Sequence, residues 1–274
     1  MSLSDIGPVV LVGAGKMGLA LARGWMAGGL PADRLVLCDP MPSETATAFA
    51  TEHDVRLVDS PVGVFTHVLV LAVKPQVMNQ VMAEVQQVVG GQTLVLSIAA
   101  GINLASLAAA LGTQRVVRTM PNTPAQIGKG ISGAVGLMIS DEDRAVTEAL
   151  LKAAGAVLWF DDESRIDAVT AVSGSGPAYV FHMVEALAAA AERQGFTSDE
   201  AMQLARATVI GSAALLEAEA TTSAAQLRIN VTSPKGTTAA ALEVLMDSRD
   251  GLAPLLDRAV SAARRRSEEL GRGG

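Results

Sequence analysis

A short apolar run at Val9–Val12 is followed at once by three spaced glycines, Gly13, Gly15 and Gly18, and then by helical periodicity. The first glycine of such a loop permits a tight turn, and the second lets the backbone approach a pyrophosphate. The third lets the helix pack closely on the strand. The start of the helix offers free N–H groups and a positive partial charge to phosphates. This order of strand, loop and helix predicts a dinucleotide-binding site.

The residues beside this loop bear on which nucleotide it accepts. Lys16 is followed by Met17, not by the Ser or Thr of an ATP-hydrolysing loop, so ATP hydrolysis is not expected. Asp39 ends a second apolar run, Arg34–Cys38, about 20 residues after the loop. A carboxylate there bonds the ribose 2′-hydroxyl and repels a 2′-phosphate, which favours NADH. The alternative is that Asp39 is only a turn residue before Pro40.

The chain up to residue 162 alternates short apolar runs with helical patterns. Further strands are expected at His67–Val73, Thr93–Ile98, Arg115–Met120, Gly133–Ile139 and Val157–Phe160. The runs are apolar on both faces, as burial on both sides of a sheet requires. Strands that alternate with helices predict an α/β fold with a mainly parallel, doubly wound sheet and right-handed crossovers.

The pattern changes after Asp161–Asp162, where no further strand is expected. A long helical stretch, Ile166–Gln194, is interrupted by a Ser/Gly-rich segment at Ser173–Pro177. Further helices are expected from Thr197 to about Ala218 and at Ala224–Asn230, Thr237–Met246 and Leu252–Leu270. We therefore expect two domains, an α/β domain over residues 1–162 and an all-helical domain over residues 163–274.

The composition excludes several classes of function. Hydrophobic residues make up 50% of the chain and aromatic residues 3%, which suits a large core but not the stacking of nucleic-acid bases. A net charge of −7 argues against binding to nucleic acid or to an anionic membrane. The lone Cys38 and three scattered histidines predict neither a disulfide nor a metal site. We expect no signal peptide, no membrane span and a cytoplasmic location.

Four later segments do not follow from a generic dinucleotide-binding pattern. They are Ala72–Gln76 (AVKPQ), Arg118–Ala125 (RTMPNTPA), Val172–Phe181 (VSGSGPAYVF) and Val231–Thr238 (VTSPKGTT). With GAGKMG, and in this order, they resemble the pyrroline-5-carboxylate reductases from residue 9 to about residue 250. The resemblance implies an N-terminal Rossmann-type domain and an all-α C-terminal dimerisation domain. It also implies that NAD(P)H reduces 1-pyrroline-5-carboxylate to L-proline.

The same resemblance implies an assembly and a set of cofactor contacts. Family members form homodimers through interleaved helical domains, often as a ring-like decamer, with each active site between one subunit's cofactor domain and the partner's helices. The expected cofactor residues are Gly13, Gly15, Lys16, Met17, Gly18, Asp39, Ala72, Val73, Lys74, Pro75, Ala99, Ala100, Pro121 and Asn122. The family often uses NADPH whereas Asp39 favours NADH, so the expectation is NAD(P)H with the phosphate undecided.

The segment Val231–Thr238 is expected to bind the substrate. A break at Ser233–Pro234 precedes the start of a helix, whose N–H groups and hydroxyls suit a carboxylate. The alternative is a plain helix cap. The resemblance implies substrate contacts from Val231, Ser233, Gly236, Thr237 and Thr238, with Thr238 as the catalytic residue that bonds the ring nitrogen.

One position in this segment departs from the family. The family usually has Gly where this chain has Lys235. The lysine can add a charge near the carboxylate, or it can shift the loop by disfavouring a positive φ. The matched motifs contain no clear acid/base pair, so we expect catalysis mainly by proximity and orientation.

Other interpretations stay open. A related cyclic imine reductase differs only in contacts that set ring size. A β-hydroxyacid dehydrogenase shares the GxGxMG start but uses a lysine from the first long helix of its second domain, and Ile166–Gln194 contains none. A non-catalytic NAD(P)-sensing protein is the third alternative.

Overall fold

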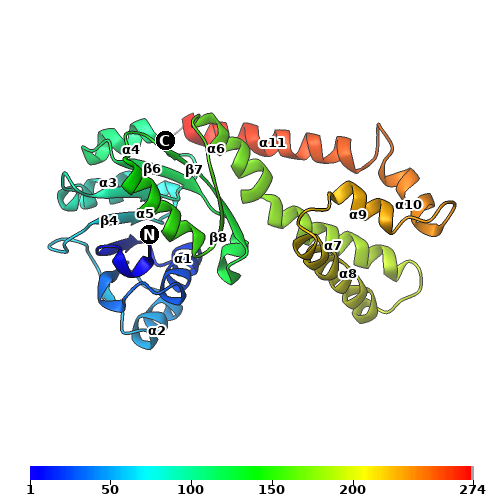
Figure 1. The fold of residues 1–274 in the computed structure, drawn as a ribbon, viewed down its shortest axis with the longest axis horizontal. Coiled ribbons are helices and arrows are strands. Elements are labelled where there is room, and N and C mark those ends of the chain that lie inside the picture. The colour runs from blue at the N-terminus through cyan, green and yellow to red at the C-terminus, as the bar shows by residue number, and fades with distance from the viewer. Residues whose placement is uncertain (273–274) are drawn as a thin grey trace. The chain divides into compact units, whose positions relative to one another are not determined.

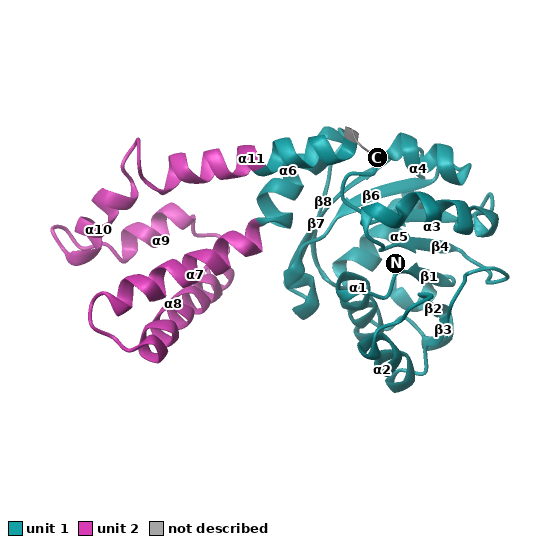
Figure 2. Ribbon diagram, turned by 180° about the vertical axis from the view of Figure 1, so that it is seen from behind, with its two compact units in different colours: residues 1–175, 263–274 teal, residues 176–262 magenta. Residues whose placement is uncertain are grey.

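The computed structural model describes residues 1–272, which divide into two compact units (Figure 1). Unit 1 comprises Met1–Ser175 together with the chain from Ala263 onward, and unit 2 comprises Gly176–Ala262 (Figure 2). Residue 162, the expected end of the α/β domain, lies within unit 1. The last strand ends shortly before it, at Trp159.

Unit 1 is built on a sheet of eight strands in the order β3-β2-β1-β4-β5-β6-β7-β8. The strands are β1 (Val9–Val12), β2 (Leu35–Cys38), β3 (Arg56–Val58), β4 (Val68–Leu71), β5 (Leu94–Ser97), β6 (Val116–Met120), β7 (Gly130–Gly136) and β8 (Gly155–Trp159). Neighbouring strands pair in parallel except for β6 and β7, which are antiparallel. The expected mainly parallel sheet is confirmed.

Helices cover both faces of this sheet. They are α1 (Lys16–Ala27), α2 (Glu44–Glu52), α3 (Met78–Val85), α4 (Leu104–Leu111), α5 (Asp141–Lys152) and α6 (Ser164–Val169). Successive strand residues point to opposite faces, so Val9 and Leu11 of β1 join one hydrophobic cluster, and Val10 and Val12 join the other. The first cluster includes residues of α1, α2 and α5, and the second includes residues of α3, α4 and α6. The sheet is therefore doubly wound.

Three local expectations are corrected. The strand Arg56–Val58 was not expected, since three residues are too few to show a period. The strand expected at Gly133–Ile139 runs from Gly130 to Gly136. Its glycines interrupt the apolar run, so the start of the strand does not show in the sequence. The 3- and 4-residue spacing of Val77, Val81, Val85 and Val88 in the sequence predicts one helical face, and this expectation is also wrong in part. Met78, Met82 and Val85 are the buried residues of α3, because a separate 3-10 turn (Pro75–Val77) leaves Val77 exposed.

The interruption expected at Ser173–Pro177 is a π-helical turn, Thr170–Gly174, closed by a hydrogen bond from Ser175 N to Thr170 O of 2.8 Å. The chain then enters α7 (Gly176–Glu192), which is followed by α8 (Ser198–Ala218), α9 (Ala224–Asn230), α10 (Thr237–Leu245) and α11 (Leu252–Arg272). A Thr197–Glu200 capping box starts α8. In residues 1–272 no helix is both long and apolar enough to cross a membrane.

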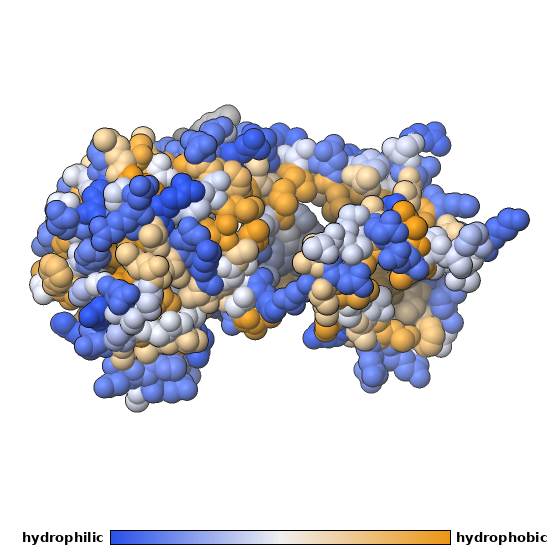
Figure 3. Space-filling view, in the orientation of Figure 1, coloured by the Kyte–Doolittle hydropathy of each residue, from blue (hydrophilic) through white to orange (hydrophobic). Residues whose placement is uncertain are grey.

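Unit 2 buries few of its apolar side chains. Its hydrophobic cluster consists of small residues, Ala188, Ala201 and Ala205, where α7 packs on α8. Larger side chains are exposed, including Phe181 (63%), Ile210 (62%) and Val244 (73%). Apolar residues accordingly lie on the surface of this unit (Figure 3). Exposed apolar area of this extent marks an interaction surface.

Candidate dinucleotide and substrate sites

Two glycines of the loop after β1 are required by the fold of unit 1 itself. Gly13 has φ +97°, and a Cβ there would lie 2.8 Å from the carbonyl carbon and oxygen of Ala72. Its N–H donates to Cys38 O over 2.8 Å, which joins the ends of β1 and β2. A Cβ on Gly18 would collide with the carbonyl oxygen of Gly13. Any other residue would strain the turn or push α1 off the sheet.

Gly15 is different, because neither conformation nor packing within this chain requires a glycine there. Its φ of −75° and ψ of −175° suit any residue, and a Cβ would meet no atom within 4 Å. It precedes α1, which no side chain caps, so N–H groups of Lys16 and Met17 in the first turn have no partner within the helix. The loop thus has an open side bounded by free donors, which fits a phosphate group that approaches the backbone closely.

Asp39 follows β2 and is tied to the glycine loop. Its Oδ2 accepts a hydrogen bond from Ala14 N over 3.0 Å, and its Oδ1 accepts one from Met41 N over 3.0 Å. The segment from Asp39 to Val55 contains no Lys or Arg. The neighbouring Arg56 pairs with Val36 at the other end of β3, away from Asp39. This segment itself therefore carries a net negative charge.

The other expected cofactor residues lie at the same edge of the sheet. Ala72, Val73, Lys74 and Pro75 follow β4, Ala99 and Ala100 follow β5, and Pro121 and Asn122 follow β6. The carboxyl ends of β1, β2 and β4 are level, because Val12 pairs with both Cys38 and Leu71. This is the edge of a parallel sheet where ligands bind, next to the point at which the strand order reverses.

Two side chains at this edge differ in what holds them. Lys74 is exposed at the start of the 3-10 turn Pro75–Val77. Asn122 is buried, and its Oδ1 accepts a hydrogen bond from Ile131 N over 2.9 Å, which ties the end of β6 to β7. Asn122 therefore has a structural partner in unit 1, a role that its sequence context did not indicate.

Cys38 lies beside this edge but is not a nucleophile. Burial, together with the negative charge of Asp39, raises the pKa of its thiol to about 11. The thiol stays protonated at neutral pH, and the thiolate is the reactive form. Among residues 1–272 no group of His, Cys, Asp and Glu is arranged to hold a metal ion.

The expected substrate segment lies in unit 2, between α9 and α10. Gly236 precedes α10 without a side-chain cap, so N–H groups of Thr237 and Thr238 are free of helical partners. Gly236 N donates to Ser233 O over 3.0 Å, which closes a turn. Thr238 is partly buried, whereas Val231, Ser233 and Thr237 are exposed.

Lys235 takes a left-handed backbone conformation, the region that glycine enters most readily. Its φ is +59°, one of two positive values at non-glycine residues in the described chain. The lysine thus does not prevent the left-handed turn. A side chain with a Cβ pays about 1–2 kcal/mol in this region, so the turn holds strain.

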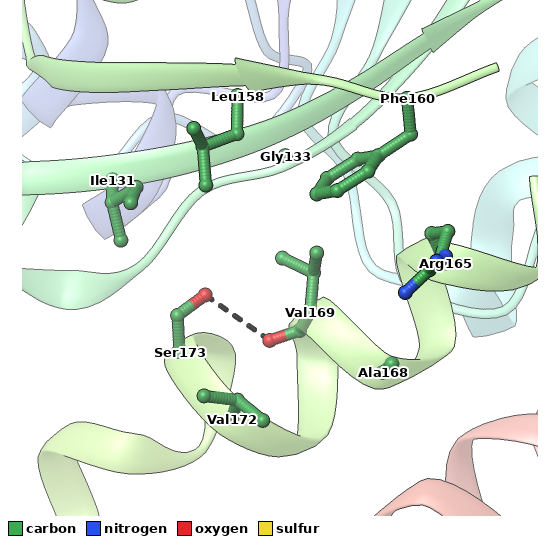
Figure 4. Close-up of a pocket in the computed structure, with 9 residues that line it drawn as sticks. All are labelled: Ile131, Gly133, Leu158, Phe160, Arg165, Ala168, Val169, Val172 and Ser173. Carbon is green, nitrogen blue, oxygen red and sulfur yellow. Dashed lines mark hydrogen bonds between the residues drawn. The ribbon is translucent and has the colours of Figure 1, made fainter. Parts of the chain in front are cut away.

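A separate hollow of about 240 Å³ lies between the outer strands β7 and β8 and the segment of α6 with its π turn (Figure 4). Its lining comprises Ile131, Gly133, Leu158, Phe160, Arg165, Ala168, Val169, Val172 and Ser173. Ser173 Oγ donates to Val169 O over 3.1 Å, as Figure 4 shows, so the hydroxyl already has a partner. None of the expected cofactor or substrate residues lines this hollow.

The fold and the loops define a class: a Rossmann-type dinucleotide-binding α/β unit joined to a helical unit. Residues 163–270 match the family described as pyrroline-5-carboxylate reductase dimerisation, and residues 8–101 match the family described as NADP oxidoreductase, coenzyme F420-dependent. The chain is 41% identical to the pyrroline-5-carboxylate reductase of Pseudomonas aeruginosa over 266 residues, which is 96% of each chain. It belongs to the pyrroline-5-carboxylate reductase family.

Solved structures agree with this assignment. A pyrroline-5-carboxylate reductase from Coxiella burnetii superposes with a TM-score of 0.88 at 32% identity, covering 97% of this chain and 99% of that one. The Plasmodium falciparum enzyme, with NADP bound, gives a TM-score of 0.82 at 26% identity, covering 97% and 99%. The dimerisation family model supports a homo-oligomer, in accord with the apolar surface of unit 2.

Proposed function

We propose that this protein is a pyrroline-5-carboxylate reductase, which transfers hydride from NAD(P)H to the C=N bond of 1-pyrroline-5-carboxylate and yields L-proline. The observation that carries the proposal is the match to pyrroline-5-carboxylate reductases over 96% of the chain. This match spans both units, and each unit supplies one part of what the reaction needs. Unit 1 offers the dinucleotide loop, and unit 2 offers an anion site for a carboxylate.

The residues of the glycine loop fit a dinucleotide. Gly15 supports this fit most directly, because its missing side chain leaves open space that the fold does not use. The free N–H groups at the start of α1 would receive the pyrophosphate. When bound, the reduced nicotinamide supplies the hydride. We assign the remaining contacts to the loops that follow β2, β4, β5 and β6, which contain Asp39, Ala72–Pro75, Ala99–Ala100 and Pro121–Asn122.

The segment Val231–Thr238 would hold the substrate. The carboxylate would accept hydrogen bonds from N–H groups at the start of α10, where the helix dipole favours an anion. The Thr238 hydroxyl would bond the ring nitrogen. The pyrrolinium ion can enter already protonated, and hydride addition at carbon leaves the former C=N π pair on nitrogen, so no strong general acid is needed. The protein would act mainly by holding the two reactants in line.

We further propose a homodimer formed through unit 2, with decamers built from such dimers. The support is the exposure of residues such as Phe181, Ile210 and Val244, which a helical unit of this size cannot cover by itself. A cytoplasmic location agrees with a single cysteine, Cys38, that is reduced and buried.

An assay with purified protein tests the function. Pyrroline-5-carboxylate would be mixed with NADH or NADPH, and loss of the nicotinamide absorbance would be followed. We expect cofactor consumption and stoichiometric formation of L-proline. Piperideine-2-carboxylate, a larger cyclic imine, and a β-hydroxyacid serve as comparison substrates. A folded protein that consumes neither cofactor with pyrroline-5-carboxylate would contradict the proposal. A higher kcat/KM for piperideine-2-carboxylate than for pyrroline-5-carboxylate would make the larger cyclic imine the assigned substrate.

A further inference from the structure

A buried arginine in unit 1 lies between two carboxylates. Arg118 of β6 is only 4% exposed. Its Nη1 donates to Glu163 Oε1 over 2.8 Å, and its Nη2 lies 3.6 Å from Asp167 Oδ1. Glu163 precedes α6, and Asp167 lies within it. A buried guanidinium needs such partners, so this cluster holds α6 against the sheet.

Each of the two carboxylates also binds a segment that is distant in the sequence. Glu163 Oε1 accepts a hydrogen bond of 2.8 Å from the backbone N–H of Leu104, the first residue of α4. Asp167 Oδ1 accepts one of 2.7 Å from the hydroxyl of Ser267, which is buried at 6% exposure on α11. The cluster therefore links β6, α6, the start of α4 and the end of the chain.

The end of α11 also lies against the loop between β5 and α4. Gly101 in this loop has φ +76°, and a Cβ on it would lie 3.3 Å from the carbonyl carbon of Leu270. The chain from Ala263 onward belongs to unit 1, as the teal end of α11 in Figure 2 shows. The helix packs against the loop where only a glycine fits without strain.

The loop held in this way carries Ala99 and Ala100, two of the proposed cofactor residues. It is fixed at its far end by Glu163 through Leu104, and in its middle by the contact of Gly101 with Leu270. At its near end Ala99 N donates to Ser97 Oγ over 3.3 Å. Two of these three restraints come from outside the strand and helix that the loop connects.

We propose that the last turns of α11 and the acid pair Glu163–Asp167 position the β5–α4 loop for the dinucleotide, which makes the C-terminal end of the chain part of the cofactor site. Ser267, Glu163 and Asp167 are positioning residues: they act through Leu104 and Gly101 and do not touch the cofactor. The inference rests on the proposed function in one respect only, that this loop contacts the dinucleotide.

The test uses the full chain with Ser267→Ala and, separately, Glu163→Ala. Binding of NADH and NADPH would be titrated by nicotinamide fluorescence, and unfolding would be followed by thermal melting. Each variant should raise the dissociation constant of the preferred cofactor about tenfold, equivalent to about 1.4 kcal/mol. The kcat at saturating cofactor should stay near that of the wild type, because the displaced loop is restored once the cofactor is bound. Ser267→Thr keeps the hydroxyl and should keep the wild-type dissociation constant.

Asp143→Asn is the matched control. Asp143 pairs with Arg115, an ion pair in the same unit that lies at the start of β6, the opposite end from the cofactor edge. This substitution should lower the melting temperature without changing the dissociation constant. If Glu163 and Ser267 only stabilised the fold, the control would weaken cofactor binding as much as their variants do at an equal loss of melting temperature.

Three results would overturn the inference. The first is an unchanged dissociation constant in both folded variants. The second is a rise in the dissociation constant of Asp143→Asn equal to that of the two test variants. Such a rise would mean that loss of stability in general, and not the position of the loop, weakens cofactor binding. In either case the proposed function stands, because the wild type still binds and reacts. The third is a folded wild type that binds neither cofactor, which overturns the proposed function as well.

Discussion

The backbone amide of Ala14 donates a hydrogen bond of 3.0 Å to Oδ2 of Asp39, which ties the glycine loop to the end of β2. The same carboxylate accepts from Met41 N through its other oxygen. Asp39 therefore holds the loop whether or not a ribose is present, and it begins a segment, residues 39–55, without Lys or Arg. A structural role and a role in cofactor choice are compatible, because each carboxylate oxygen can accept more than one hydrogen bond.

Removal of this charge should change cofactor preference. We expect Asp39→Ser to raise the ratio of kcat/KM for NADPH over NADH about tenfold, about 1.4 kcal/mol, as for a partly screened unit charge. Asp39→Asn keeps an oxygen that can accept a hydrogen bond from Ala14 N. It should shift the ratio as Asp39→Ser does, but lower the melting temperature less than Asp39→Ser. Steady-state kinetics with both cofactors decide the point. An unmoved ratio would leave Asp39 with its structural role at the glycine loop alone.

Gly15 allows binding to be separated from folding. Because its backbone angles suit any residue and its Cβ direction is open, Gly15→Ala should leave the melting temperature unchanged. The added methyl would meet the pyrophosphate and weaken dinucleotide binding by about tenfold or more. Gly91→Ala, at another glycine with open space around it, is the control. Equal affinity in Gly15→Ala and the wild type would argue against a phosphate at this position.

Thr238→Ala tests the substrate loop. The variant should lose about 10- to 100-fold in kcat/KM for pyrroline-5-carboxylate, the range for a hydrogen bond to a charged group. Its affinity for NAD(P)H should be close to that of the wild type, since the proposed cofactor residues lie in unit 1. Thr238→Ser retains the hydroxyl and should recover most of the rate. Wild-type kinetics in the alanine variant would remove Thr238 from the mechanism.

The left-handed conformation of Lys235 predicts a gain in stability on substitution by glycine. Lys235→Gly removes the Cβ that makes a φ of +59° unfavourable. It should stabilise the folded state by up to about 1 kcal/mol, part of the relief being offset by the greater freedom of glycine in the unfolded chain. Lys235→Ala removes the charge but keeps the Cβ, and should show no such gain. Denaturant unfolding of the wild type, Lys235→Gly and Lys235→Ala measures the free energy of unfolding of each protein. Equal free energies for the glycine and alanine variants would show that the turn is unstrained.

The Arg115–Asp143 ion pair predicts acid sensitivity. Burial by itself raises the pKa of the Asp143 carboxyl, but hydrogen bonds from Arg115 and Ser140 outweigh burial and leave this pKa below its ordinary value. A carboxyl with a lowered folded pKa stabilises the fold above its unfolded pKa of about 3.9, and this contribution is lost as pH falls through the folded pKa.

Asp143→Asn should therefore melt at a lower temperature than the wild type at pH 7, and the gap should narrow as the pH falls below about 4. Melting curves of both proteins from pH 7 to pH 3 measure this difference in melting temperature. A gap of constant size would show that Asp143 does not titrate with folding.

Much of unit 1 is visible in the sequence because its determinants are local. The glycine loop and the apolar runs are contiguous segments, and the hydrogen bonds of a helix or a tight turn join residues close in the chain. The Ser140 cap of α5 is of the same kind, with both partners within three residues. The strand Arg56–Val58 escaped detection since its three residues gain their stability from pairing with β2 and not from their own pattern.

By itself, the sequence predicted a phosphate loop formed by β1, Gly13–Gly18 and α1, because the apolar run, the spaced glycines and the helical periodicity follow one another in a single contiguous segment. Only the tertiary structure decided that Gly15 alone of the three glycines is not needed by the fold. It alone also showed that the end of α11 belongs with the sheet. Both facts depend on which atoms meet across the molecule, as when Ser267 bonds Asp167 at a separation of 100 residues, and no local pattern records such a contact.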